Sequence, residues 1–100
     1  MRDGVHHPFV ANMDAIRKQV ELAGVRFANN SAIGNSIFDL VLPDAKIAIE
    51  FFAVSPEKRA IAREAGFTVL CFSRQEIRSG TALDILLWEI RERGLNRRNQ

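Results

Sequence analysis

The chain has 100 residues, of which 47% are hydrophobic and 26% are charged, and a formal net charge of +2. This composition predicts a globular protein and excludes a disordered chain, because the apolar fraction can fill a core and the charge is nearly balanced. A disulfide within the chain is excluded as well, since Cys71 is the single cysteine. The apolar neighbours of Cys71 predict that it is a small buried hydrophobe.

No segment predicts secretion or insertion into a membrane. Residues 1–8 lack the apolar stretch of a signal peptide, and no apolar run approaches the roughly 20 residues that span a bilayer. We therefore expect a cytoplasmic protein with no membrane partner. Residues 1–100 are expected to form a single domain, with residues 1–7 and 95–100 as tails.

The N-terminal third predicts a helix, a short strand and a loop. Pro8 suits the first position of a helix, because no hydrogen bond is lost there, and apolar residues recur at helical spacing up to Val20. We expect this helix over residues 8–23. Residues 25–28 predict a short strand, and residues 29–35 predict a loop or a wide hairpin connection because turn-forming residues dominate that segment.

A hairpin and a second helix are predicted next. Residues 36–42 and 46–52 are rich in β-branched and aromatic residues, which favour strands. The tight turn at residues 43–45 joins them, so the two strands must be antiparallel. Ser55, followed by a proline and an acidic residue, is typical of a helix start, and this helix is expected to end near residue 65.

The last third predicts a strand and two helical segments. The almost uninterrupted apolar run Phe67–Phe72 indicates a strand that is buried on both faces. A short helical turn is expected over residues 73–78. Thr81, with Asp84 in the capping-box position, predicts the start of a final helix that ends at Gly94. The order α-β-β-β-α-β-α predicts an α+β fold, in which helices flank a central mixed sheet.

Two carboxylates interrupt the apolar pattern of the predicted hairpin. Asp39 and Glu50 each have an apolar residue on both sides. Because neighbouring strands lie about 4.8 Å apart, the two acids can approach each other across the hairpin. A divalent cation such as Mg²⁺ would satisfy both carboxylates. The alternative interpretation is that both acids are exposed at the rim of the sheet.

Three segments, residues 26–30, 37–50 and 63–72, occur in the order and spacing of a known group of nucleases. They include Ile37-Phe-Asp-Leu-Val-Leu-Pro-Asp-Ala-Lys-Ile-Ala-Ile-Glu50 and Gly66-Phe-Thr-Val-Leu-Cys-Phe72. Over residues 25–90 the chain resembles the small PD-(D/E)XK, restriction-endonuclease-like proteins related to very-short-patch-repair endonucleases. The resemblance implies hydrolysis of a DNA phosphodiester that depends on Mg²⁺ or Mn²⁺, with Asp39 and Glu50 as the metal ligands.

The chain departs from the pattern of this group at one catalytic position. Two residues beyond the glutamate, where the group has a lysine or a second acid, this chain has Phe52. Lys58, in the first turn of the next helix, is the candidate that supplies the missing catalytic charge; its alternative interpretation is a solvated helix residue. For the glutamate that the group has in its first helix, Asp14 and Glu21 are only weak counterparts.

Four arginines near the C-terminus make the charge distribution uneven: Arg91, Arg93, Arg97 and Arg98. They are candidates for binding the phosphate backbone of a nucleic acid. Alternatively, they provide favourable charge at a helix C-terminus, followed by a solvated tail.

Three functions remain compatible with the sequence. The first is a metal-dependent nuclease that acts on DNA. The second is a catalytically inactive relative that still binds nucleic acid. The third is a module that binds a protein partner, such as a regulator or inhibitor encoded by a mobile element, with Trp88 as a contact. A homodimer fits the first two, because so small a domain has little surface with which to grip a duplex.

Overall fold

A computed structural model describes the backbone of residues 8–93 and the side chains of residues 13–93. The predicted tails, residues 1–7 and 95–100, lie outside the described residues. The elements, in chain order, are α1 (Pro8–Leu22), β1 (Ala28–Ile33), β2 (Ser36–Leu42), β3 (Ile47–Phe51), α2 (Pro56–Glu64), β4 (Thr68–Phe72), α3 (Arg74–Ser79) and α4 (Thr81–Glu92). No helix within residues 8–93 is both long enough and apolar enough to cross a bilayer.

The strands form one four-stranded sheet in the order β1-β2-β3-β4. β2 pairs antiparallel with β1 and with β3, whereas β3 and β4 are parallel and are joined through α2. A parallel pair needs such a crossover, because after β3 the chain must return to the end of the sheet at which β3 began. The predicted α+β fold with a mixed sheet and flanking helices is therefore confirmed.

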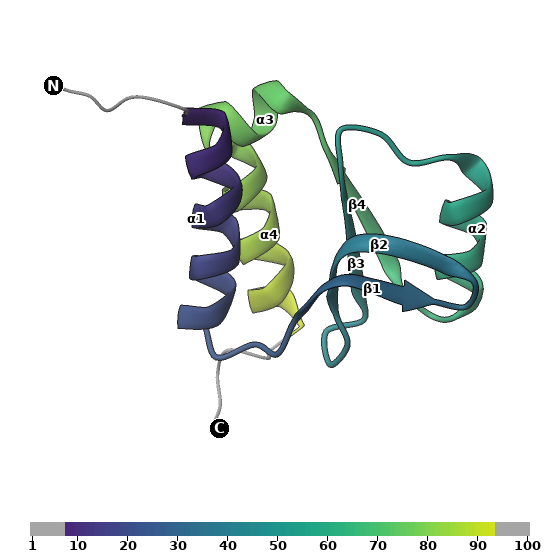
Figure 1. Ribbon diagram of the computed structural model, residues 1–100. Helices are drawn as coiled ribbons and strands as arrows, with labels where there is room; N and C mark the ends of the chain where they lie inside the picture. The colour runs from purple at the N-terminus through teal and green to yellow at the C-terminus, as the bar shows by residue number, and fades with distance from the viewer. Residues whose placement is uncertain (1–7, 94–100) are drawn as a thin grey trace, which may run out of the picture.

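Helices cover both faces of this sheet (Figure 1). On one face, α1, α3 and α4 pack together and bury Ile16, Ile77 and Leu86 against the sheet. On the other face, α2 buries Ala62 against a smaller apolar cluster. Successive side chains of β3 point to opposite faces, so Ile49 enters the larger core while Glu50 faces α2. All five residues of β3 are buried as a result.

The prediction for residues 25–35 was wrong in its bounds, although a short strand joined by a hairpin to the next strand is present. The strand begins only at Ala28 and continues through the segment expected to be a loop, as far as Ile33. A two-residue turn reverses the chain there, with Gly34 at a φ of +61°, so that Ile33 pairs with Ser36. Backbone pairing with β2 thus overrides the weak strand preference of the polar residues in β1.

Gly34→Ala is expected to destabilise the protein by about 1–2 kcal/mol from the left-handed backbone alone. An added Cβ would also lie 3.1 Å from the side chain of Ile61, which adds a steric cost. The control is Gly66→Ala, since Gly66 has a φ of +88° but no atom within 4 Å of an added Cβ. Urea unfolding should show the larger loss of stability for Gly34→Ala; equal losses would mean that the contact with Ile61 relaxes without cost.

β4 is less buried than its apolar sequence predicts. Residues 68–71 are only half-buried, and Cys71 is among them. β4 is one of the two edge strands of the sheet, so no further strand protects its outer side. The predictions of a strand buried on both faces and of a fully buried cysteine were therefore wrong.

The start of the final helix also differs from its prediction. Gly80, with a φ of +89°, is both the C-cap of α3 and the N-cap of α4, and no side chain caps α4. Thr81 is instead the first residue of the helix, so the predicted capping box with Asp84 does not form. Because the two helices share one capping residue, no position for a threonine cap remains between them. Gly94, the predicted end of α4, lies outside the described residues.

Candidate active site at the open end of the β2–β3 hairpin

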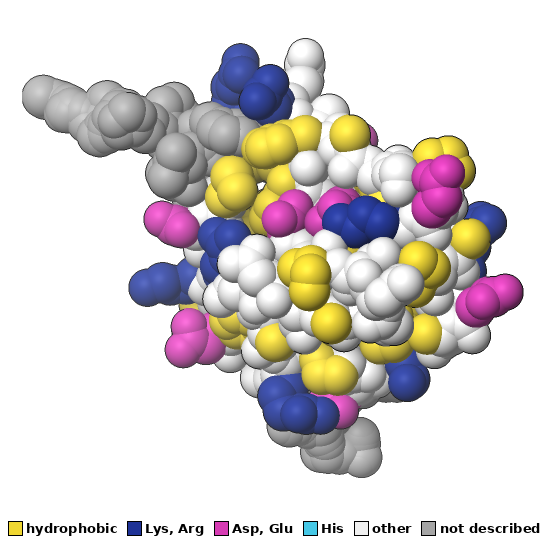
Figure 2. All heavy atoms as spheres, turned by 45° about the vertical axis from the view of Figure 1, so that its right-hand side comes forward, with side chains coloured by type: hydrophobic (Ala, Val, Ile, Leu, Met, Phe, Trp, Pro, Cys, Tyr) yellow, Lys and Arg dark blue, Asp and Glu magenta, His cyan; other side chains and the backbone are white. Residues whose placement is uncertain are grey.

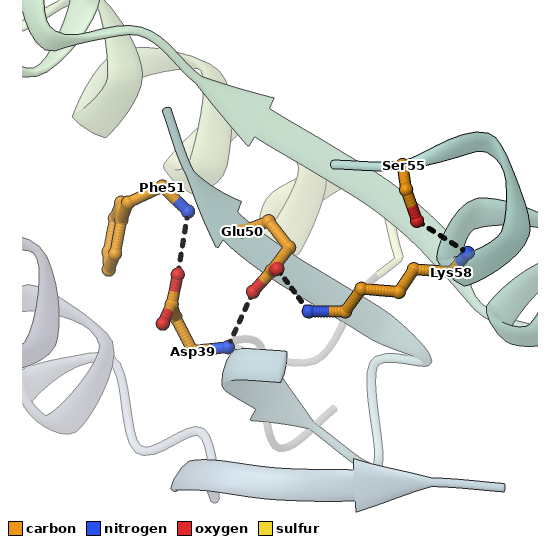
Figure 3. Close-up of polar contacts among 5 residues, drawn as sticks. All are labelled: Asp39, Glu50, Phe51, Ser55 and Lys58. Carbon is orange, nitrogen blue, oxygen red and sulfur yellow. Dashed lines mark hydrogen bonds and ion pairs between the residues drawn. The ribbon is translucent and has the colours of Figure 1, made fainter. Parts of the chain in front are cut away.

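Asp39 and Glu50 lie side by side where the backbone pairing of β2 with β3 stops (Figure 3). The ladder runs from Leu42 and Ile47 next to the turn as far as Leu40 and Ile49. Beyond that point the carboxylates accept the backbone hydrogen bonds. The N–H of Asp39 donates to Oε1 of Glu50 at 2.9 Å, and the N–H of Phe51 donates to Oδ2 of Asp39 at 2.9 Å. Each carboxylate is thus fixed by a donor on the opposite strand.

Lys58 reaches this pair from α2. The N–H of Lys58 donates to the side chain of the N-cap residue Ser55 at 3.1 Å, which fixes the first turn of the helix. The Nζ atom of Lys58 forms an ion pair with Oε2 of Glu50 (Figure 3). The same atom lies 4.8 Å from the centre of the Phe38 ring. The three predicted catalytic residues therefore lie together. Their roles in catalysis stay predictions.

Burial makes this cluster energetically unusual. Glu50 is 8% exposed and is the one polar or charged residue among residues 13–93 that is buried. A buried carboxylate is costly unless hydrogen bonds and a countercharge compensate for the lost water, and here a backbone N–H and Lys58 do so. Replacing such a cluster with apolar residues is often neutral or stabilising for a fold. Its presence in a domain this small therefore points to a functional site.

The donor set fits a hard divalent cation. Within residues 13–93, no protein group donates a hydrogen bond to Oδ1 of Asp39, whereas Glu50 has a partner at both oxygens. No group of three or more His, Cys, Asp or Glu residues that could hold a metal occurs in that part of the chain. A cation here would have two protein carboxylates and take its other ligands from water or phosphate, which is how proteins usually hold Mg²⁺.

Around the acid pair lie Phe52, which the sequence analysis singled out, and two arginines that it did not. Phe52 follows β3 with a φ of +82° and is 39% exposed. Arg17 of α1 lies with its guanidinium 5.9 Å from the centre of the Phe51 ring, and Arg74 of α3 lies 4.7 Å from that of Phe52. No local pattern marks these arginines, because only the packing of α1 and α3 against the end of β3 brings them there.

Of the four arginines predicted to bind nucleic acid, Arg93 does not lie with the acid pair. The guanidinium of Arg93 donates to the backbone oxygen of Ala45 at 3.1 Å and to Oγ1 of Thr68 at 2.7 Å. These residues precede β3 and begin β4, at the opposite end of the sheet from Glu50. Arg91 is exposed on α4, and Arg97 and Arg98 lie outside the described residues. A role of these arginines in nucleic-acid binding stays a prediction.

Cys71 borders the site through the parallel ladder, in which it is the partner of Glu50. Burial raises the pKa of its thiol, and the nearby negative charges of Glu50 and Glu76 raise it further, while Arg59 acts in the opposite direction. The thiol therefore stays protonated near neutral pH and is a poor nucleophile. It is not part of the proposed chemistry.

Comparison with known proteins yields the fold but no family. No family model matches the chain, and no curated protein matches it in sequence. Among solved structures, the chain is similar to the catalytic domain of the homing endonuclease I-Bth0305I, with a TM-score of 0.67 and 13% identity. The match covers 89% of this chain and 98% of that domain. The chain therefore has the fold of a nuclease catalytic domain, and at this level of identity the similarity shows the fold alone.

Proposed function

We propose that this domain hydrolyses phosphodiester bonds in DNA with a divalent metal ion, Mg²⁺ or Mn²⁺. The observation that carries the proposal is the cluster of Asp39, Glu50 and Lys58 at the open end of the hairpin, within a fold also found in a nuclease catalytic domain. Two acids and a lysine held together at a strand end are suited to binding a cation and a phosphate at the same place.

Each residue has a distinct role in the proposal. Asp39 and Glu50 would hold the metal ion, which when bound supplies polarisation of the phosphate and activation of water. The ammonium group of Lys58 stabilises the negative charge that develops on the phosphate oxygens. Its ion pair with Glu50 keeps the lysine oriented toward the site before DNA binds. The positive charge that Phe52 cannot provide thus comes from the neighbouring helix.

A cleavage assay on supercoiled plasmid and on single-stranded DNA tests the proposal. We expect nicked or linear product with Mg²⁺ or Mn²⁺ and none with excess EDTA, since the metal ion supplies the positive charge that activates water and polarises the phosphate. Isothermal titration with Mn²⁺ provides a readout that does not depend on turnover. Absence of both cleavage and Mn²⁺ binding would refute the proposal.

A catalytically inactive protein of the same fold, which binds nucleic acid or a protein partner as a regulator or inhibitor, is the second candidate. The observation that favours it is the half-exposed ring of Phe52 at the position where the nucleases that the sequence resembles have a lysine or an acid. Trp88, 52% exposed on α4, is available to a protein partner. In this case the wild type would not cleave DNA, and Phe52→Lys would introduce some metal-dependent activity.

We further propose that residues 1–100 act as one domain in the cytoplasm, and that two copies associate on DNA. A single copy of this size offers a small contact area compared with most protein–DNA interfaces.

A further inference from the structure

Two adjacent phenyl rings, flanked by two guanidinium groups, form a row across the end of β3. The Cζ atom of Arg17 lies 5.9 Å from the centre of the Phe51 ring, the centres of the Phe51 and Phe52 rings are 6.2 Å apart, and Cζ of Arg74 lies 4.7 Å from that of Phe52. Its two phenylalanines directly follow Glu50 in the chain, and its arginines come from α1 and α3. We call these four residues the Arg–Phe row.

The first half of the row is coupled to the acid pair. Arg17 lies beside the ring of Phe51, and the N–H of Phe51 donates to Oδ2 of Asp39. The Nε atom of Arg17 donates to Oδ1 of Asn29 at 2.8 Å, and its Nη1 lies 3.6 Å from a carboxylate oxygen of Asp14. These contacts hold the guanidinium in place while 30% of the side chain stays exposed.

The second half of the row depends on an uncommon backbone conformation. A φ of +82° is rare for a bulky residue, because the Cβ atom then crowds the backbone. The N–H of Phe52 donates to the backbone oxygen of Phe72 at 2.6 Å, which holds Phe52 at the end of the parallel pair. Strained residues persist where the surrounding structure maintains them, and they cluster at functional sites. Here the ring of Phe52 supports the guanidinium of Arg74.

The charge of the site explains why such a row is needed. Asp39 and Glu50 carry two negative charges, and Lys58 offsets one of them. A bound divalent ion would offset the remaining negative charge, but in the metal-free protein this charge repels a phosphate backbone, so DNA binding without metal requires further cations close by. Figure 2 shows acidic side chains near the centre of one face, with Lys and Arg side chains on both sides of them.

We propose that Arg17 and Arg74 each contact a DNA backbone phosphate, on the two sides of the phosphate that is cleaved, and that Phe52 is the positioning residue for Arg74. Guanidinium groups that stack on a ring keep their N–H groups in a fixed plane, which suits bidentate binding of phosphate oxygens. The choice of DNA as the ligand rests on the proposed function. The position equivalent to the missing lysine thus still contributes a positive charge, through the arginine that Phe52 orients.

Fluorescence anisotropy with a labelled 16-base-pair duplex, in EDTA and over a series of NaCl concentrations, tests the proposal without cleavage. Each phosphate contact contributes about 0.9 to the slope of log affinity against log salt, which corresponds to about eightfold in affinity at 0.1 M salt. We expect Arg17→Gln and Arg74→Gln each to lower the salt slope and the affinity by these amounts. Arg63→Gln, at the exposed end of α2, is the matched control and should change neither the salt slope nor the affinity for the duplex.

Three further variants test whether Phe52 positions Arg74, and whether Arg17 acts through its charge or by stabilising the fold. Phe52→Leu should weaken binding, and combining it with Arg74→Gln should weaken binding no more than Arg74→Gln alone, because both changes remove the same contact. Arg17→Lys should retain the salt slope of the wild type although it loses the bond to Asn29. If the salt slope of Arg17→Lys fell as far as that of Arg17→Gln, Arg17 would be needed for the structure of the domain and not for contact with a phosphate.

The outcomes distinguish this inference from the proposed function. Salt slopes of Arg17→Gln and Arg74→Gln equal to that of the wild type would overturn the inference, even if the wild type cleaves DNA. Reduced slopes in a protein without metal-dependent cleavage would support the row as a DNA-binding surface and refute the proposed catalysis.

Discussion

Asp39→Asn is expected to abolish metal-dependent cleavage, lowering kcat/KM about 10³-fold or more. A catalytic metal ion supplies several kcal/mol of transition-state stabilisation, and each 1.4 kcal/mol corresponds to a factor of ten in rate. The amide oxygen of an asparagine can still accept the hydrogen bond from the N–H of Phe51, so the hairpin should keep its geometry. What the variant loses is the negative charge that attracts a divalent ion.

Three measurements check this expectation together: the cleavage rate, the Mn²⁺ affinity by calorimetry, and the free energy of unfolding in urea. Stability should change by no more than about 1 kcal/mol, since no cavity is created and Asp39 is only half-buried, so water can accept from the new amide N–H groups. Asp44→Asn is the matched control, because Asp44 lies in the turn at the other end of the hairpin, where it pairs with Arg26, and it should leave cleavage unchanged. Cleavage by Asp39→Asn within tenfold of the wild type would show that Asp39 does not hold the metal.

Lys58→Ala is the second change with a large expected effect, a loss of about 10²–10³ in cleavage rate. Removing one preorganised group that stabilises developing charge typically costs this much. Within residues 13–93, Lys58 is the one lysine or arginine whose ion pair reaches the acid pair. Lys18→Ala, which removes an exposed lysine from α1, is the control and should cleave at the wild-type rate.

The stability of Lys58→Ala needs a separate control, because the change leaves the buried Glu50 without its countercharge. Removing one partner of a buried ion pair lowers the free energy of unfolding by about 3–5 kcal/mol. Because Lys58 is partly exposed, we expect a loss near the lower end of that range. Lys58→Ala combined with Glu50→Gln removes the unpaired charge and should recover part of the stability without recovering cleavage. Robust cleavage by Lys58→Ala would instead assign the catalytic charge to another residue.

Much of the fold follows from local features of the sequence. The turn at residues 43–45 imposes an antiparallel hairpin, because three residues cannot carry the chain across the sheet. Ser55 and the following proline start α2 in the structure as in the prediction, since capping depends only on neighbouring residues. The closeness of Asp39 and Glu50 follows as well. Both interrupt apolar strands, and antiparallel neighbours with matching register bring such residues together.

Other features depend on which segments the tertiary structure brings together. The residues of β1 have little intrinsic preference for a strand, and only the Gly34 turn and pairing with β2 make them one. Whether an apolar strand is fully buried depends on its place in the sheet, so β4 became half-buried as an edge strand. In both cases the deciding partner lies outside the local window that periodicity can measure.

The chemistry around the acid pair was likewise decided by packing. The sequence by itself determined the two acids, the hairpin that carries them and a lysine in the next helix. The ion pair of Lys58 with Glu50, the Arg–Phe row, and the contacts of Arg93 at the far end of the sheet arise only when helices dock against strand ends. The physical reason is that long, flexible side chains such as lysine and arginine can reach many places. Their final positions depend on the relative placement of whole elements and not on the residues next to them in the chain.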